Sequence, residues 1–334
     1  MIISDKQELR RCVKQLVRRA DVCEASLDFD VLHGAIGVEA MLDLWARPAL
    51  TPGEALQRSV AEQTPFSPDA AAMFAALDAM DMPVRDLDRA QTMEREYERN
   101  AYLREVLDTL RAKCVLIRVP MARADEVAFE DDRFEPLMCV DRDLFNPGRY
   151  GVSYEAAARR IEAACAVCSA RNIAFDRFDA DALRYCLLPL CQDNGYALHV
   201  HLASRDEINR FAALLDAFDG VHALAAAPED EQTHLIEAAA QRMRMLVCLS
   251  DLSVMGKALT ALGTRFVPYS AQAKQPEQML GRWLLKKEVI WQALVEAYLP
   301  LARTGYELES SAVERDVRRL LSGNLLALCR PDTM

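Results

Sequence analysis

The sequence predicts an α/β protein, a (β/α)8 TIM barrel with a helical insertion after strand 1 and a helical C-terminal segment. Three observations lead to this fold class. Short apolar runs bounded by turn residues recur along the 334-residue chain, each is followed by a segment with helical periodicity, and the runs number eight. Eight parallel strands joined by crossover helices close into a barrel. We therefore expect residues 1–334 to form a single barrel domain.

The predicted strands share apolar and β-branched composition, and they lie at residues 21–27, 113–120, 136–141, 173–178, 197–202, 221–227, 245–251 and 265–270. The long interval after the first of them, residues 30–111, carries helical patterns and turn signals such as LTPGEA and FSPDA, so it is predicted as the helical insertion. Residues 276–328 are again helical in pattern. We expect that stretch to wrap the outside or one end of the barrel.

The amino-acid composition excludes some classes of binding partner. The chain is 51% hydrophobic and 27% charged, as globular proteins are, and its net charge of −11 opposes binding to nucleic acid. The charged N-terminus and the lack of a long apolar run predict a cytoplasmic protein with no membrane segment. The ten scattered cysteines are expected to be reduced, including the Cys165 and Cys168 pair in a helical run. A homo-oligomer is compatible with these features.

The chemistry of such barrels lies where strands end and loops begin. The residues at these positions are Ser26, Asp28, Arg118, Cys139, Asp141, Asp176, His199, His201, Asp251, and residues 270–274. The sharpest signal is the pair His199 and His201, because alternation along a strand places both imidazoles on one face, where they can bind one metal ion. The alternative is that one of them only hydrogen-bonds a neighbour inside the barrel.

Several stretches of the chain resemble the uronate isomerases, the glucuronate and galacturonate isomerases of the amidohydrolase superfamily. The most specific is ALGTRFVPYSAQAKQPEQMLGRW at residues 261–283, which is similar to the last strand and following helix of that family. QTPFSPDAAAMFAALDAMDMPVRDL, DDRFEPLMCVD, CLLPLCQDNGYALHV and GYELESSAVERDVRRLLSGN extend the similarity nearly end to end. The resemblance implies the barrel fold and a site that once accepted an open-chain sugar acid.

The same resemblance implies that the family's metal site is lost. Where the family has a His-x-His pair at the end of strand 1, this chain has Ser26 and Asp28, and the strand-8 aspartate falls at or near Gln272. The other changed positions are a family histidine near Ser270, an arginine replaced by Lys274, and a substrate-binding arginine replaced by Cys139. His199 corresponds to the family's strand-5 histidine, and His201 is new.

Two main functions remain open from the sequence. The first is an enzyme with a rebuilt site that acts on a small polar or carboxylate-bearing metabolite. In this site, His199, His201 and either Asp28 or Asp251 bind iron, zinc or manganese, or act without a metal. Alternatively, either aspartate has only a structural role, in a salt bridge or as a loop cap. The substrate-binding candidates are Arg118, Cys139, Tyr269, Gln272 and Lys274. The second function is a non-catalytic ligand-binding or partner-binding scaffold, and retained uronate isomerase activity is the third possibility.

Overall fold

The structure is a computed structural model that describes residues 2–3, 5–29, 68–81, 99–145, 153–273, 275–304 and 306–330. Most of the predicted insertion at 30–111 lies outside these ranges. Its described parts form two helices and no strand of their own before residue 112. The division of the chain into one domain with an insertion stays a prediction.

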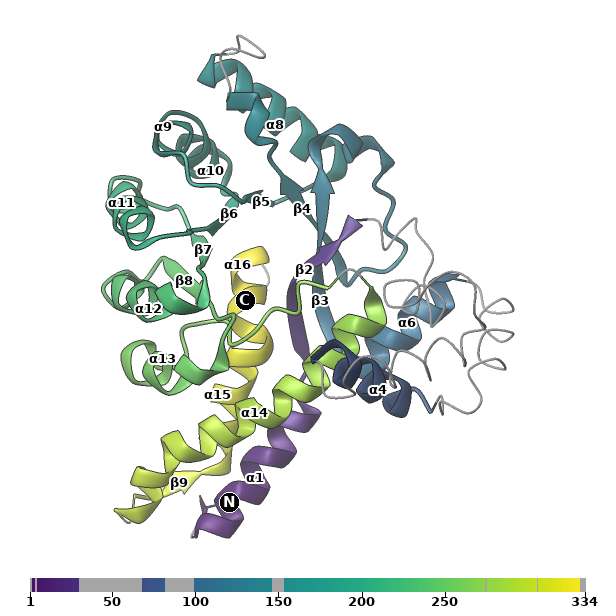
Figure 1. The fold of residues 1–334 in the computed structure, drawn as a ribbon, viewed down its shortest axis with the longest axis vertical. Coiled ribbons are helices and arrows are strands. Elements are labelled where there is room, and N and C mark those ends of the chain that lie inside the picture. The colour runs from purple at the N-terminus through teal and green to yellow at the C-terminus, as the bar shows by residue number, and fades with distance from the viewer. Residues whose placement is uncertain are drawn as a thin grey trace.

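The centre of the molecule is a curled sheet of seven parallel strands, each hydrogen-bonded to the next one in the sequence (Figure 1). The strands are β2 (Val22–Asp28), β3 (Ala112–Pro120), β4 (Phe134–Cys139), β5 (Asn172–Phe175), β6 (Ala197–His201), β7 (Ala223–Ala226) and β8 (Met245–Cys248). This order is what repeated strand-helix units produce, because each crossover helix returns the chain to the next parallel position. The α/β class and seven of the eight predicted strands are therefore confirmed.

The eighth predicted strand, residues 265–270, does not form a regular strand. Within the described ranges, the segment makes only isolated parallel bridges, from Val267 to β8 and from Ala273 to β2. Two physical reasons are local. Pro268 has no N–H to donate to a ladder, and the N–H of Ala271 donates to the buried side chain of Glu24 instead of to a neighbouring strand. The prediction of a regular eighth strand was wrong, although this segment lies between the two edges of the sheet.

Helices follow most of the strands and cover the outside of the sheet (Figure 1). They are α1 (Lys6–Arg19), α4 (Pro68–Ala79), α6 (Arg99–Leu110), α8 (Tyr154–Cys168), α9 (Ala180–Ala182), α10 (Leu188–Asn194), α11 (Arg205–Asp216), α12 (Gln232–Ala240), α13 (Met255–Leu262), α14 (Pro276–Arg303), α15 (Ser310–Arg318) and α16 (Asn324–Cys329). Short 3-10 turns cover Met121–Glu126, Arg142–Phe145, Glu229–Glu231 and Leu252–Val254, and π-helical turns cover Leu183–Leu187 and Arg319–Gly323. The short strands β1 (Ile2–Ile3) and β9 (Leu308–Glu309) pair antiparallel and join the N-terminus to the segment before α15.

Capping residues begin several of these helices. Asp5 accepts hydrogen bonds from two backbone N–H groups at the start of α1, and Ser153 and Ser204 each accept one at the starts of α8 and α11. Cys165 and Cys168 are buried on α8, and all ten cysteines of the chain are free thiols. No helix in the described ranges combines the length and apolar character that a membrane span requires.

The C-terminal helix α16 lies inside the curl of the sheet rather than outside it (Figure 1). Leu325, Leu328 and Cys329 pack in one buried cluster with inward-facing strand residues, many of them small, which are Cys23, Ala25, Cys114, Leu116, Leu137, Ala174, Ala197, Leu224 and Cys248. Arg330 then pairs with Glu135 at the amino end of β4. The expectation that the whole C-terminal stretch covers the outside or one end of the barrel is therefore wrong for its last turns, which fill the interior at the amino ends of the strands.

Candidate functional site

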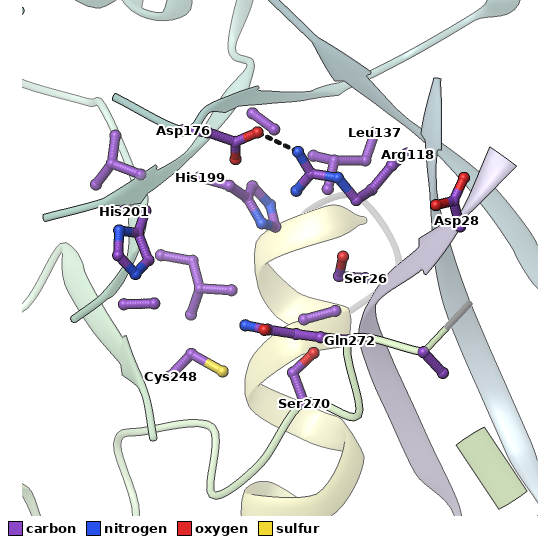
Figure 2. A pocket seen from close by; sticks show the side chains of 16 residues that line it. Ser26, Asp28, Arg118, Leu137, Asp176, His199, His201, Cys248, Ser270 and Gln272 are labelled. Atoms are coloured by element: carbon purple, nitrogen blue, oxygen red, sulfur yellow. Dashed lines mark hydrogen bonds and ion pairs between the residues drawn. The ribbon is translucent and has the colours of Figure 1, made fainter. Parts of the chain in front are cut away.

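A cavity of about 460 Å³ opens at the carboxyl ends of the strands, above α16 (Figure 2). We call it the mouth cavity. Its lining comes from all seven strands of the sheet and the segment after residue 269, and consists of Ala25, Ser26, Asp28, Arg118, Leu137, Ala174, Asp176, His199, Val200, His201, Leu224, Ala226, Cys248, Ser270, Gln272 and Ala273. Its position agrees with the rule that such folds place their chemistry at the carboxyl ends of the strands.

The mouth cavity brings together many of the residues singled out from the sequence. Ser26, Asp28, Arg118, His199, His201, Ser270 and Gln272 all line it. Cys139 instead lines a second cavity of about 510 Å³ next to the ends of β3 and β4. Tyr269 is buried and stacks edge-on against Trp283, with 5.4 Å between ring centroids. Lys274 lies outside the described residues, and the functional roles of all these residues stay predictions.

Asp251 does not line the mouth cavity. Its carboxylate accepts hydrogen bonds from the backbone N–H (2.8 Å) and the hydroxyl of Ser253. These bonds stabilise the ionised form and lower the pKa of Asp251. The residue is therefore a loop cap, which is the structural role that the sequence analysis gave as the alternative. It supplies no carboxylate to the two histidines.

Arg118 and Asp176 form an ion pair across the cavity wall (Figure 2). Arg118 is near the end of β3, whereas Asp176 follows directly after β5, so the guanidinium reaches past β4. The Asp176 side chain is 62% exposed and the Arg118 side chain is 32% exposed. A guanidinium is protonated at every accessible pH, so the mouth cavity contains a permanent positive charge.

The two histidines share the inward face of β6 but have different environments. His199 is 8% exposed, and its Nε2 lies 3.3 Å from Oδ1 of Asn172. Burial, followed by the positive charge of Arg118, lowers the pKa of His199 from 6.5 to about 3. His199 is therefore a neutral imidazole at physiological pH. His201, two residues further along the strand, is exposed and faces the cavity (Figure 2).

Sequence reasoning missed Asn172. Its side chain is fully buried, and Nδ2 has no hydrogen-bond partner within the described ranges. The available signal was alternation, because Asn172, Ala174 and Asp176 share one face of β5 and the last of these was a candidate. A polar residue at an inward position of an otherwise apolar strand needs a partner, and here that partner is His199.

Glu24 was also missed, and it binds Ser26 and Ser270, two residues that line the mouth cavity. Its fully buried carboxylate accepts hydrogen bonds from the N–H of Ser26 (3.0 Å), the hydroxyl of Ser270, the N–H of Ala271 (2.8 Å) and Nε1 of Trp283 (2.8 Å). Burial raises the pKa of Glu24, and the four hydrogen bonds oppose this shift. The signal was a charged residue within the apolar strand VCEASLD.

The segment that Glu24 holds then adopts an unusual backbone at Gln272. This residue has φ +47°, in the left-handed region that side chains other than glycine adopt rarely. Such conformations persist only where the surroundings enforce them, and they cluster at functional sites. Here the fixed segment directs the Gln272 side chain into the mouth cavity (Figure 2).

Two solved structures with the same fold are similar to this one over nearly their whole length. A uronate isomerase from Bacillus halodurans C-125 matches with a TM-score of 0.81 at 16% identity, covering 98% of this chain and 97% of that chain. A uronate isomerase from Thermotoga maritima matches with a TM-score of 0.65 at 10% identity, covering 96% and 97%. The chain has the fold of the uronate isomerases. No family model and no curated protein matches its sequence.

A metal centre does not fit the donor set that the structure describes. In the described part of the chain, no three His, Cys, Asp or Glu side chains form a group able to hold a metal ion. Asp251 is engaged elsewhere and Asp176 pairs with Arg118. The cationic guanidinium also lies close enough to His199 to lower its pKa, and a positive charge at that place disfavours a bound cation. A metal ion bound by the two histidines stays a prediction.

Proposed function

We propose that this chain is an enzyme on a uronate-isomerase-like scaffold, in which a rebuilt mouth cavity binds a small polyhydroxylated carboxylate and moves a proton on it. The family's metal ligands are replaced in this proposal, and Arg118 and the histidines take their place. One observation carries the proposal: a guanidinium, two imidazoles and several hydroxyl and amide groups converge on one cavity. Fold similarity alone would not support it, because function depends on the site.

The lining is suited to a sugar-acid-like ligand. Its volume of about 460 Å³ falls within the range of small-molecule sites. Arg118 supplies the planar, charged donor that recognises carboxylates. Ser26, Ser270 and Gln272 supply groups that both donate and accept hydrogen bonds, as ligand hydroxyls require.

The two histidines are assigned different roles. His199 is neutral and buried, so it can orient a ligand hydroxyl but not supply a proton at neutral pH. His201 is the exposed imidazole of the lining, and histidine is the side chain that most often transfers protons in enzymes. We therefore assign the proton-transfer step to His201 and the positioning of the ligand to His199 and Arg118.

Binding tests the first half of the proposal. Isothermal titration of the purified chain with D-glucuronate, D-galacturonate and D-gluconate is expected to give binding that the neutral polyol D-glucitol does not give. The R118Q variant should lose it, whereas R159Q, which changes an exposed arginine on α8, should not. Equal binding of D-glucitol and the acids, or unchanged binding by R118Q, would contradict the carboxylate assignment.

Turnover and metal content test the second half. We expect no interconversion of glucuronate and fructuronate above background with zinc or manganese supplied. Gln272 has no titratable group, and the hydroxyl of Ser26 is a poorer ligand for a divalent metal than a histidine is. A bound iron, zinc or manganese ion stays a prediction that elemental analysis of protein purified without chelator decides. Stoichiometric metal that H199A and H201A both lose would establish a metal centre in place of the metal-free site proposed here. Ligand binding without turnover of any acid would favour the non-catalytic scaffold.

A further inference from the structure

Asp176 occupies the place on Arg118 where a ligand carboxylate would bind. Resting on the proposed function, we infer that Asp176 is a built-in stand-in for the ligand, which the ligand's own carboxylate must displace. The charges around the cavity give the first argument. Of the described lining residues, only Arg118 has a permanent positive charge, and two carboxylates, Asp28 and Asp176, face the same space. A third carboxylate that approaches the guanidinium is repelled by these two, so its binding favours the release of Asp176 from Arg118.

The geometry of the ion pair gives the second argument. Within the described residues, Arg118 donates to protein through a single nitrogen, Nη2, to one oxygen of Asp176. A guanidinium carries five N–H donors arranged to bind a carboxylate through two parallel hydrogen bonds. The remaining donors of Arg118 are therefore available, and a ligand carboxylate that binds through both oxygens makes one hydrogen bond more than Asp176 does.

Releasing Asp176 from Arg118 also requires little free energy. Its side chain is 62% exposed, so the released carboxylate returns to water without a desolvation penalty. Exposed ion pairs contribute about 0–1 kcal/mol. Asp176 also lies after the last residue of β5, so its side chain can turn away without breaking the sheet. The pair therefore keeps Arg118 oriented without a ligand, and it separates when a ligand carboxylate binds.

Substitutions separate this arrangement from an ordinary structural ion pair. D176N keeps the shape of the side chain and removes its charge. If Asp176 competes with the ligand, D176N should bind D-gluconate about fivefold more tightly than the wild type, since removing a competitor worth about 1 kcal/mol changes the dissociation constant by that factor. D176A is the second variant, with the same expected direction. R118Q should lose binding in either background.

A matched control distinguishes competition from a general change of charge. D206N also removes one carboxylate, on the exposed first turn of α11, and should leave the affinity unchanged. Circular dichroism melts show whether each variant is folded. In addition, the carboxyl ¹³C resonance of Asp176 in labelled wild-type protein should move when D-gluconate is added, a readout that needs no folded variant.

The outcomes separate the two proposals. Tighter binding by D176N and D176A, lost in R118Q, together with a moving Asp176 resonance, supports the stand-in. Binding that depends on Arg118 but is equal or weaker in D176N overturns it and leaves the proposed function standing. Failure of the wild type and of D176N to bind any of the acids overturns both, because a vacated Arg118 would then attract no carboxylate.

Discussion

The buried histidine of the mouth cavity should make the fold sensitive to mild acid. His199 has a pKa of about 3 in the folded chain, whereas an unfolded histidine titrates near 6.5. Between these two values the unfolded state binds a proton that the folded state does not. The free energy of unfolding therefore rises with pH in this window, and the contribution of His199 to it is lost progressively as the pH falls below about 6.5.

The size of the effect follows from the part of the window that is crossed. One pKa unit corresponds to about 1.4 kcal/mol, and a change from pH 7.5 to pH 5 crosses roughly 1.5 units below the unfolded value. His199 alone should therefore lower the free energy of unfolding by about 2 kcal/mol over that change. Because the side chain is 8% exposed, solvent screening reduces this number little.

The H199Q variant isolates this contribution. Glutamine cannot titrate and can still hydrogen-bond Asn172, so urea denaturation at pH 7.5, 6 and 5 should give H199Q a pH slope that is smaller by about 2 kcal/mol over the range. Comparing slopes cancels the constant cost of the substitution. H222Q, which changes an exposed histidine just before β7, should keep the wild-type slope. If H199Q and the wild type lose the same stability between pH 7.5 and 5, His199 is not a neutral buried imidazole.

Three further substitutions, two on α14 and one at the buried carboxylate of Glu24, test the packing of the fold by urea denaturation. Burial lowers the pKa of Lys287 from 10.5 to about 8. Between these values the unfolded chain binds a proton that the folded chain does not, so the free energy of unfolding of the wild type should rise with pH there. K287M should remove that rise and increase the free energy of unfolding by about 2 kcal/mol at pH 7. A Cβ on Gly281 would lie 1.7 Å from the carbonyl oxygen of Ala72, so G281A should cost about 2 kcal/mol or more by pushing α4 away, whereas G256A, with nothing within 4 Å, should be neutral or stabilising. E24Q turns an acceptor oxygen into a donor facing other donors and should cost about 3 kcal/mol, with a changed fluorescence spectrum. A stable G281A, or an E24Q with wild-type stability and spectrum, would contradict the packing described above.

The parts of the site that period-two alternation governs could be predicted from the sequence. Inward positions on one strand repeat every second residue, so a recognised histidine at 199 places 201 beside it, and both line the cavity. Arg118 and Asp28 follow from the same rule applied to the ends of their strands. What alternation cannot supply is pairing across strands, and so the partnership of Arg118 with Asp176 could not be read from the sequence.

The parts that depend on side chain to backbone contacts could not be predicted. The segment 265–270 has the composition of a strand, but Pro268 and the capture of the Ala271 N–H by Glu24 prevent regular pairing. Nothing local to that segment shows that a glutamate more than two hundred residues earlier competes for its backbone. The left-handed backbone at Gln272, directly after this contact, could not be predicted either, because glutamine does not favour that conformation.

The interior of the curled sheet connects the C-terminal helix to the site. Parallel barrels fill their interior with bulky branched side chains. Here several inward positions carry alanine or cysteine, and Leu325 and Leu328 of α16 occupy the space that these small residues leave. Larger strand residues would exclude the helix, and loss of the helix would leave an empty apolar space below His199. The small inward residues and the helix that packs against them therefore depend on each other.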